Sequence, residues 1–165
     1  MAVITFCYGE ITPGDVATTM YPSTSEIPGR LRENFMLERL QVAGAPAPQG
    51  PYSSVVRAGD FLYVSGQGPV DPISGEIDPE TTIRDQTRLV LQNLQTILRG
   101  CGADLQDVVK CSVYLHDVKE FELMNEVYGE VFGAYKPART TVGAGMVALG
   151  MKVEIDCVAY LPKPA

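Results

Sequence analysis

The chain has 165 residues, of which 45% are hydrophobic and 20% charged, which suits a single globular domain with its own core. Its 20 acidic residues outnumber its 13 lysines and arginines, and the net charge is −7. Because such a surface repels phosphate backbones, we expect no nucleic-acid partner. The apolar runs are shorter than a membrane span and no secretory signal is recognisable, so we expect a cytoplasmic protein without a membrane partner.

The cysteines and the single histidine of this chain do not favour a metal site or a histidine-activated nucleophile. None of the four cysteines belongs to a CxxC pair, and the only histidine is His116. These numbers and spacings fit no zinc pattern. A Ser-His-Asp or Cys-His hydrolase needs a histidine beside its nucleophile, whereas His116 lies at an expected strand–helix junction. The chain also has no P-loop or dinucleotide fingerprint, so we expect no metal and no cofactor.

Residues 1–44 differ from the rest of the chain because proline and glycine recur throughout them, and both residues interrupt helices and strands. A short strand is expected at Val3–Tyr8, and Leu31–Leu40 has some helical spacing. We interpret the segment as an extended arm that packs on the domain or on a neighbouring subunit. A disordered leader is the alternative. The folded domain is expected to span residues 45–165.

The first elements of this domain follow from its hydrophobic patterns. Ser54–Ala58 and Phe61–Ser65 are expected to be short strands joined by a Gly-Asp turn. Thr82–Arg99 is expected to be a helix because its apolar residues recur at i, i+3, i+4 spacing. A threonine is placed to cap its start, and Gly100 follows its end.

The second half of the domain continues the same alternation. Val108–Leu115 has the composition of a buried strand. Asp117 is expected to cap a second helix, with Glu120 completing a capping box. Strands at Thr140–Val147 and Lys152–Leu161 end the domain, and the second of these alternates apolar and polar residues.

The expected order, β-β-α-β-α-β-β, belongs to the α+β class. Two helices cannot cover both faces of a sheet of four or five strands, so we expect both helices on one face. Several residues of the other face are apolar and must also be covered. Self-association into a closed ring achieves this economically.

Arg139 is the first candidate for chemistry. It lies between a helix end and a strand, in the segment Pro137-Ala138-Arg139-Thr140-Thr141. A guanidinium held at the start of a strand can bind a carboxylate through two parallel hydrogen bonds. An ordinary surface arginine is the alternative.

Glu154 is the second candidate. It lies in the middle of the last strand, between Val153 and Ile155. Partial burial there would raise the pKa of its carboxyl and suit it to moving a proton or orienting water. A solvated strand face is the alternative. Tyr52, which follows a Gly-Pro turn, and Ser65-Gly66, where glycine allows close approach of a ligand, are weaker candidates.

Together these pieces resemble the Rid (YjgF-like) family of imine and enamine deaminases. About 120 residues match in the family's order. The matching stretches are Ala45-Pro46-Ala47-Pro48-Gln49-Gly50-Pro51-Tyr52-Ser53, Val64-Ser65-Gly66-Gln67, Val108-Val109-Lys110, Met124-Asn125-Glu126-Val127-Tyr128, Pro137-Ala138-Arg139-Thr140-Thr141, and Val153-Glu154-Ile155-Asp156-Cys157-Val158-Ala159.

The resemblance implies a chorismate-mutase-like protomer with a mixed sheet, a homotrimer with three clefts between subunits, and no cofactor. It implies hydrolysis of 2-imino acids, or their enamine tautomers, to 2-oxo acids and ammonia. Arg139 would hold the substrate carboxylate and Glu154 would position or activate water. The substrate-binding residues would be Tyr52, Ser65, Gly66, Asn125 and Thr141.

Two departures from the family pattern bear on this reading. Many active members have a cysteine where this chain has Thr141, and the segment Gly143–Ala148 replaces a stretch that usually contains glutamate and a Leu-Pro pair. A non-catalytic trimer, binding a carboxylate metabolite or acting as a chaperone, is therefore an alternative. An endoribonuclease or translation inhibitor is a further alternative, against which the net charge of −7 argues.

Overall fold

The computed structural model describes residues 37–162, which form one six-stranded sheet with two α-helices and two single-turn 3-10 helices. The expected strand at Val3–Tyr8 lies outside the described residues. The strands and α-helices are β1 (Leu37–Leu40), β2 (Val55–Ala58), β3 (Phe61–Gln67), α2 (Ile83–Gly100), β4 (Val108–Leu115), α3 (Phe121–Phe132), β5 (Ala138–Gly143) and β6 (Val153–Tyr160).

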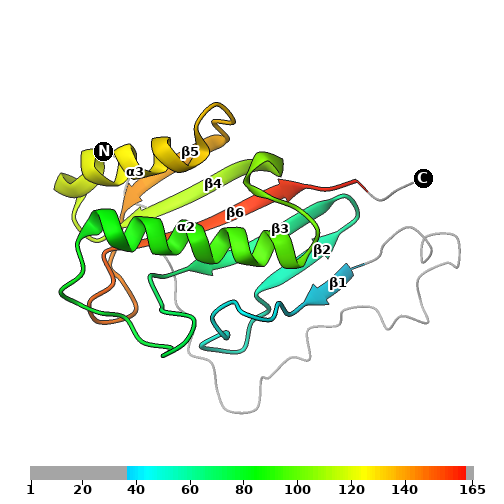
Figure 1. Ribbon diagram of the computed structural model, residues 1–165, viewed down its shortest axis with the longest axis horizontal. Helices are drawn as coiled ribbons and strands as arrows, with labels where there is room; N and C mark the ends of the chain where they lie inside the picture. Colours follow the sequence, from blue (N-terminus) through cyan, green and yellow to red (C-terminus); the bar gives the residue numbers. More distant parts are fainter. Residues whose placement is uncertain (1–36, 163–165) are drawn as a thin grey trace, which may run out of the picture. The chain divides into compact units, whose positions relative to one another are not determined.

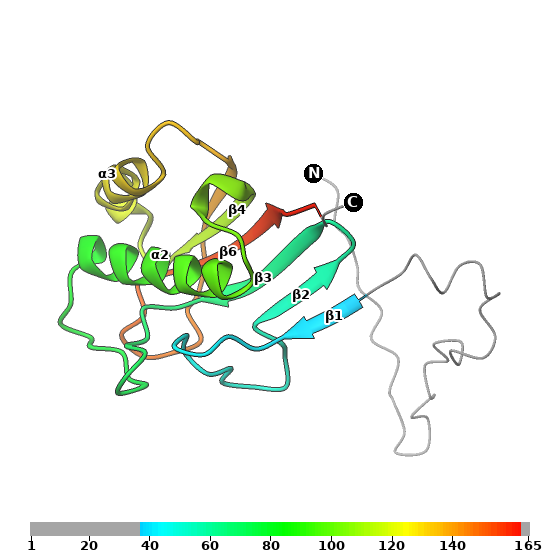
Figure 2. The same cartoon turned by 45° about the vertical axis from the view of Figure 1, so that its right-hand side comes forward.

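The sheet is mixed, with strand order β1-β2-β3-β6-β4-β5. Only β4 and β5 run parallel, and the other neighbouring strands are antiparallel. Both helices lie on the same face of the sheet (Figures 1 and 2). The α+β fold expected from the sequence, with two helices on one face of a mixed sheet, is thus confirmed.

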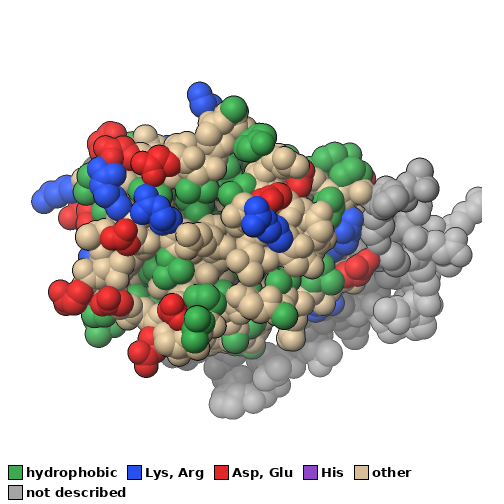
Figure 3. Space-filling view, viewed as in Figure 1, with side chains coloured by type: hydrophobic (Ala, Val, Ile, Leu, Met, Phe, Trp, Pro, Cys, Tyr) green, Lys and Arg blue, Asp and Glu red, His purple; other side chains and the backbone are tan. Residues whose placement is uncertain are grey.

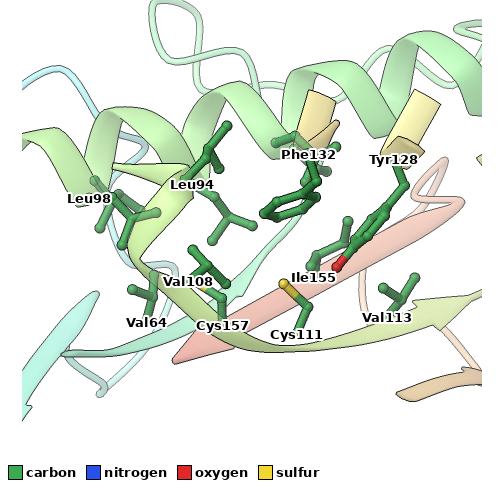
Figure 4. Close-up of a cluster of buried hydrophobic side chains, with 14 of the residues drawn as sticks. Val64, Leu94, Leu98, Val108, Cys111, Val113, Tyr128, Phe132, Ile155 and Cys157 are labelled. Carbon is green, nitrogen blue, oxygen red and sulfur yellow. The ribbon is translucent and has the colours of Figure 1, made fainter. Parts of the chain in front are cut away.

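The core fills the space between the helices and the sheet (Figure 4). Alternate residues of β3, β4 and β6 face the helices and are buried, and each fully buried aliphatic side chain stabilises the fold by roughly 1.5–3 kcal/mol. Tyr128 and Phe132 of α3 point into the same layer, with ring centroids 4.5 Å apart. The side chains labelled in Figure 4 include Val64, Leu94, Leu98, Val108, Cys111, Val113, Ile155 and Cys157, all buried.

The opposite face of the sheet has no helix over it within residues 37–162. Its aromatic side chains stay partly exposed: Phe61 at 39%, Tyr63 at 49% and Tyr160 at 45%. Phe61 and Tyr160 contact each other, with ring centroids 5.3 Å apart. This face therefore offers apolar area to a partner. By contrast, acidic and basic side chains are interspersed on the helix face (Figure 3).

Two strand boundaries differ from expectation. Leu37–Leu40, part of a segment with helical spacing, is strand β1 because it pairs with Val55–Ala58 in an antiparallel ladder. The sheet consequently begins before residue 45. Strand β5 ends at Gly143 and not at Val147, since the glycine and alanine that follow have low β-propensity.

The start of α3 also differs. Asp117 does cap a turn, but its side chain accepts a hydrogen bond from the Lys119 N–H of a 3-10 turn at Val118–Glu120. The helix itself begins at Phe121 without a side-chain cap. The capping box expected between Asp117 and Glu120 was therefore wrong.

No helix among residues 37–162 combines the length and apolar character that a membrane crossing requires.

The segment between β5 and β6 turns at Gly150, where φ is +80°. A Cβ atom at this position would lie 2.8 Å from Cβ of Pro79 and 2.9 Å from its Cα. Both the backbone conformation and the space therefore require glycine.

We expect Gly150→Ala to lower the free energy of unfolding by about 1–3 kcal/mol because it combines a strained φ with a steric clash. Gly145 lies in the same segment, but a Cβ atom there would have no neighbour within 4 Å. Gly145→Ala should therefore change the free energy by less than about 0.5 kcal/mol. Urea denaturation measures both variants, and equal stability of the two would contradict this account.

Candidate active site

Arg139 is held at the start of β5 by three side chains of α3. The parallel register pairs Arg139 with buried Cys111 of β4, which directs both side chains to the helix face. Nη2 of Arg139 donates a 2.7 Å hydrogen bond to Oδ1 of Asn125. The guanidinium carbon lies 4.5 Å from the ring centroid of Tyr128 and 5.7 Å from that of Phe121. These contacts orient the cation and leave part of its donor fork uncommitted.

Arg139 makes no ion pair with a carboxylate among residues 37–162. By contrast, two arginines of α2 do have carboxylate partners: Arg84 pairs with Glu126, and Arg88 pairs with Glu130. Arg139 instead opens into a cavity of about 360 Å³. Lys136 also lines this cavity, and no acidic residue does. The full lining is Asn125, Tyr128, Gly129, Phe132, Gly133, Lys136, Pro137 and Arg139. An anion is the ligand that this surface fits.

Thr141 lies two residues beyond Arg139 on the same side of β5. Its Oγ1 atom is buried and has no hydrogen-bond partner in the described part of the chain. A buried hydroxyl without a partner costs about 1–3 kcal/mol. Cys111, which pairs with Arg139 on the neighbouring strand, is not a reactive nucleophile. Burial raises the pKa of its thiol to about 11, so the thiol stays protonated.

Glu154 belongs to a second group of residues. It pairs with Tyr114 of β4 on the face opposite to Cys111 and is half-buried in the wall of a cavity of about 700 Å³. Burial, and then the negative charge of Asp156, raises the pKa of the Glu154 carboxyl. The pKa thus moves in the direction that partial burial predicted.

Gly66 gives the Glu154 carboxylate its space. The pairing of β3 with β6 is irregular between Val64 and Gln67, which is the kind of bulge often found beside active sites. A methyl group at Gly66 would overlap the Glu154 carboxylate. Glycine at this position therefore allows the carboxylate to lie directly against the backbone of β3.

Ser65 and Tyr52 line the same cavity. The Ser65 hydroxyl donates a 2.7 Å hydrogen bond to the carbonyl of Ser53, which fixes its direction. Tyr52 is 49% exposed, and its hydroxyl accepts a 3.1 Å hydrogen bond from the N–H of Gln49. Both side chains are thereby positioned at the cavity wall before any ligand binds.

The site residues expected from the sequence thus fall into two groups. Arg139, Asn125 and Thr141 are associated with the helix side of the sheet, whereas Tyr52, Ser65, Gly66 and Glu154 line the larger cavity. The two cavities share no lining residue. One protomer therefore does not bring Arg139 and Glu154 together. Their partners on β4, Cys111 and Tyr114, are an odd number of residues apart and so face opposite sides of the sheet.

Sequence reasoning missed the role of Phe121 and Tyr128 in holding Arg139. The available signal was helical spacing: Phe121, Asn125 and Tyr128 stand at i, i+4 and i+7 on one face of α3. It also missed Lys136, whose side chain lines the Arg139 cavity and whose φ of +39° is unusual for a lysine. No group of three or more His, Cys, Asp or Glu side chains that could hold a metal ion occurs within residues 37–162.

Comparison with known proteins identifies the family of this chain. The family model described as Endoribonuclease L-PSP matches residues 42–161. A RutC family protein of Pyrococcus horikoshii is 46% identical over 125 residues, covering 76% of this chain and 98% of that protein. The chain belongs to the Rid (YjgF-like) family.

Two further relatives carry more specific names. The chloroplastic Reactive Intermediate Deaminase A of Arabidopsis thaliana is 39% identical over 117 residues, which cover 71% of this chain and 62% of that protein. The crystal structure of E. coli TdcF with bound serine superimposes with a TM-score of 0.69 at 32% identity, covering 74% of this chain and 98% of that one. Every candidate residue of this Rid domain, from Tyr52 to Glu154, lies inside the family match.

We expect Asp156→Asn to lower the pKa of Glu154, because it removes the negative charge that disfavours ionisation of that carboxyl. The pKa should stay above the ordinary value, since burial is the larger cause. Carbon-13 NMR titration of the Glu154 carboxyl measures both effects. Glu122→Gln removes the same charge from an exposed position on α3 and should leave the Glu154 pKa unchanged. An equal shift in the two variants would refute the local effect of Asp156.

Proposed function

We propose that this protein is a cofactor-independent hydrolase that converts reactive 2-imino acids, or their enamine tautomers, into 2-oxo acids and ammonia. The observation that carries the proposal is the state of Arg139. It is oriented by Asn125 and Tyr128, opens into a cavity and has no carboxylate partner among the described residues. A substrate carboxylate supplies the missing anion. The name of the Arabidopsis relative supports the assignment to deamination.

The proposal requires two protomers for each site. Arg139 and Glu154 point to opposite sides of one sheet, so one small substrate cannot reach both within one protomer. The uncovered aromatic face of the sheet favours association, with Phe61, Tyr63 and Tyr160 partly exposed. A homotrimer would provide three equivalent clefts, each combining the Arg139 group of one subunit with the Glu154 group of the next.

The chemistry asks for orientation and for one proton carrier. Water attacks the carbon of the protonated C=N bond, a C–O bond forms, and the nitrogen keeps the electron pair of the former double bond. Glu154 accepts a proton from the attacking water and returns it to the nitrogen. The C–N bond then breaks and its electron pair leaves with ammonia. The hydroxyl oxygen forms the C=O bond of the 2-oxo acid and gives its proton to Glu154, which releases it to ammonia or to water. A carboxyl with a raised pKa exchanges protons more readily near neutral pH than an ordinary glutamate does.

Arg139 acts in this scheme by holding the carboxylate so that the imine carbon faces Glu154 and its water. Fixing two reactants in this way removes much of the entropic cost that the activation free energy includes when they meet in free solution. Ser65, Gly66 and Tyr52 would supply polar groups around the developing tetrahedral carbon. Asn125 fixes the guanidinium, and the Thr141 hydroxyl, which has no partner in the described chain, would bond to the substrate or to the neighbouring subunit.

The proposal is tested by coupling a threonine dehydratase to the protein and following 2-oxo acid release, with semicarbazide competing for the imine. Wild type should accelerate release. Arg139→Ala should lower kcat/KM roughly 10- to 100-fold or more, as expected for losing a charged hydrogen-bond donor worth about 1.5–3 kcal/mol. Arg88→Ala removes a surface arginine from α2 and should keep full activity. Full activity of Arg139→Ala would reject the proposal.

The pH dependence tests Glu154 separately. Below its raised pKa the carboxyl is protonated and cannot accept a proton from water, so the wild-type rate should fall with acidification at a pH above about 4.3, the ordinary value for glutamic acid. Asp156→Asn should move this fall to lower pH. Glu154→Gln should lose roughly 100-fold or more in kcat and show no such fall. A Glu154→Gln variant with the wild-type profile would exclude Glu154 as the proton acceptor.

A non-catalytic carboxylate-binding trimer is the second candidate. The uncommitted guanidinium of Arg139 supports carboxylate binding whether or not turnover follows. Calorimetry with a stable 2-oxo acid separates the two functions. Binding that requires Arg139, without acceleration for any imine, would favour this second candidate.

A further inference from the structure

We propose that two buried amides of α2, Gln86 and Asn93, are positioning residues that hold two wall segments of the Glu154 cavity in place. Neither side chain lines the cavity. Each is nevertheless bonded to the backbone of a segment that does. The structural part of this inference stands on those contacts alone, whereas its catalytic consequence rests on the proposed deaminase function.

Gln86 fixes the wall that leads into β6. Its side chain is buried, with 1% of the residue exposed. Nε2 donates a 2.8 Å hydrogen bond to the carbonyl of Gly150, and Oε1 accepts a 2.8 Å hydrogen bond from the N–H of Lys152. These two bonds bracket Met151, which lines the cavity. They also end two residues before Glu154, so the amide sets where β6 begins.

Asn93 fixes the wall that follows β3. It is 3% exposed. Its Nδ2 donates to the carbonyl of Val70 at 2.9 Å and lies 3.4 Å from the carbonyl oxygen of Gly68. Gly68 and Val70 both line the Glu154 cavity. This wall continues directly from Gly66, against which the Glu154 carboxylate lies.

The two amides act as a pair because one rigid helix carries them. Gln86 and Asn93 are seven residues apart, which places them two turns apart on the same face of α2. α2 lies over the sheet (Figures 1 and 2). The two wall segments approach each other closely at Gly68, since a Cβ there would lie 2.7 Å from Sδ of Met151. One helix therefore anchors the backbone of both segments.

The residue type matches this role. Irregular segments that pass under a helix bury carbonyl and N–H groups that need partners. An amide carries its donor and its acceptor on two separate atoms of one neutral side chain, and Gln86 uses both, one toward Gly150 and one toward Lys152. Thr87 provides a contrast on the same helix. It is also buried, but its hydroxyl donates its hydrogen bond to the carbonyl of Ile83 within α2 and not to the backbone of either wall segment.

Hydrogen exchange tests the structural part on the full chain. Gln86→Ala should speed exchange about tenfold or more in peptides covering 147–153, and most directly at the Lys152 amide that loses its acceptor. Asn93→Ala should do the same for peptides covering 66–72. Thr87→Val, a buried change on the same helix, and Gln92→Ala, an exposed one, should change neither wall selectively. Equal loosening of both walls in each amide variant, or no local change, would overturn the inference.

Kinetics test the consequence for the reaction. Imines made by an amino-acid oxidase from alanine and from leucine probe a short and a long side chain. Displaced walls should change the ratio of the two kcat/KM values about tenfold in Gln86→Ala and Asn93→Ala, with Thr87→Val keeping the wild-type ratio, because small misplacements near reacting groups are costly. An unchanged ratio in both amide variants would overturn the positioning role. If wild type hydrolyses neither imine, the proposed function fails, and the exchange data still decide whether the amides hold the walls.

Discussion

The pairing of β4 with both of its neighbours determines where the Arg139 and Glu154 side chains point. Cys111 faces the helices, and it stands opposite Arg139 in the parallel ladder and opposite Cys157 in the antiparallel one. Arg139 must therefore face α3, where Asn125 and Tyr128 hold it. Glu154 is an odd number of residues from Cys157 and must face the other side. A slip of one residue in either ladder would reverse this arrangement.

The same strand pairing places the two candidate groups on opposite faces of the sheet. On the helix face, the oriented guanidinium of Arg139 has no carboxylate partner among the described residues. On the other side a half-buried carboxyl, whose pKa is raised, lies against Gly66. The reaction proposed above would require both groups. The exposed aromatic residues of the uncovered face would give the protomers a physical reason to associate.

Helix α2 connects the core to the larger cavity. Its apolar stripe packs on the sheet, while Gln86 and Asn93 on the buried side donate to loop backbone near the ends of β6 and β3. The helix thereby transmits the rigidity of the core to cavity walls that are otherwise built from irregular segments. Val147 and Leu149, which also line this cavity, are by contrast almost fully exposed.

Local patterns predicted most of the elements. The helical stripe of α2 and the alternation in β6 were recognisable because each repeats over several turns or residue pairs. The errors arose where context outweighs pattern. Leu37–Leu40 is a strand because β2 is available to pair with it. The capping box at Asp117 failed because a 3-10 turn precedes α3, and the expected end of β5 failed at a run of small residues.

The sequence by itself determined the α+β class, the Rid family and the residue types from which a carboxylate-binding, proton-transferring site can be built. Those features depend on short stretches of neighbouring residues. Only the tertiary structure decided that Arg139 and Glu154 lie on opposite faces, and that Gln86 bonds to Lys152, 66 residues away. The reason is physical: strand register and the partners of buried amides are set by contacts between distant segments, which no local pattern encodes.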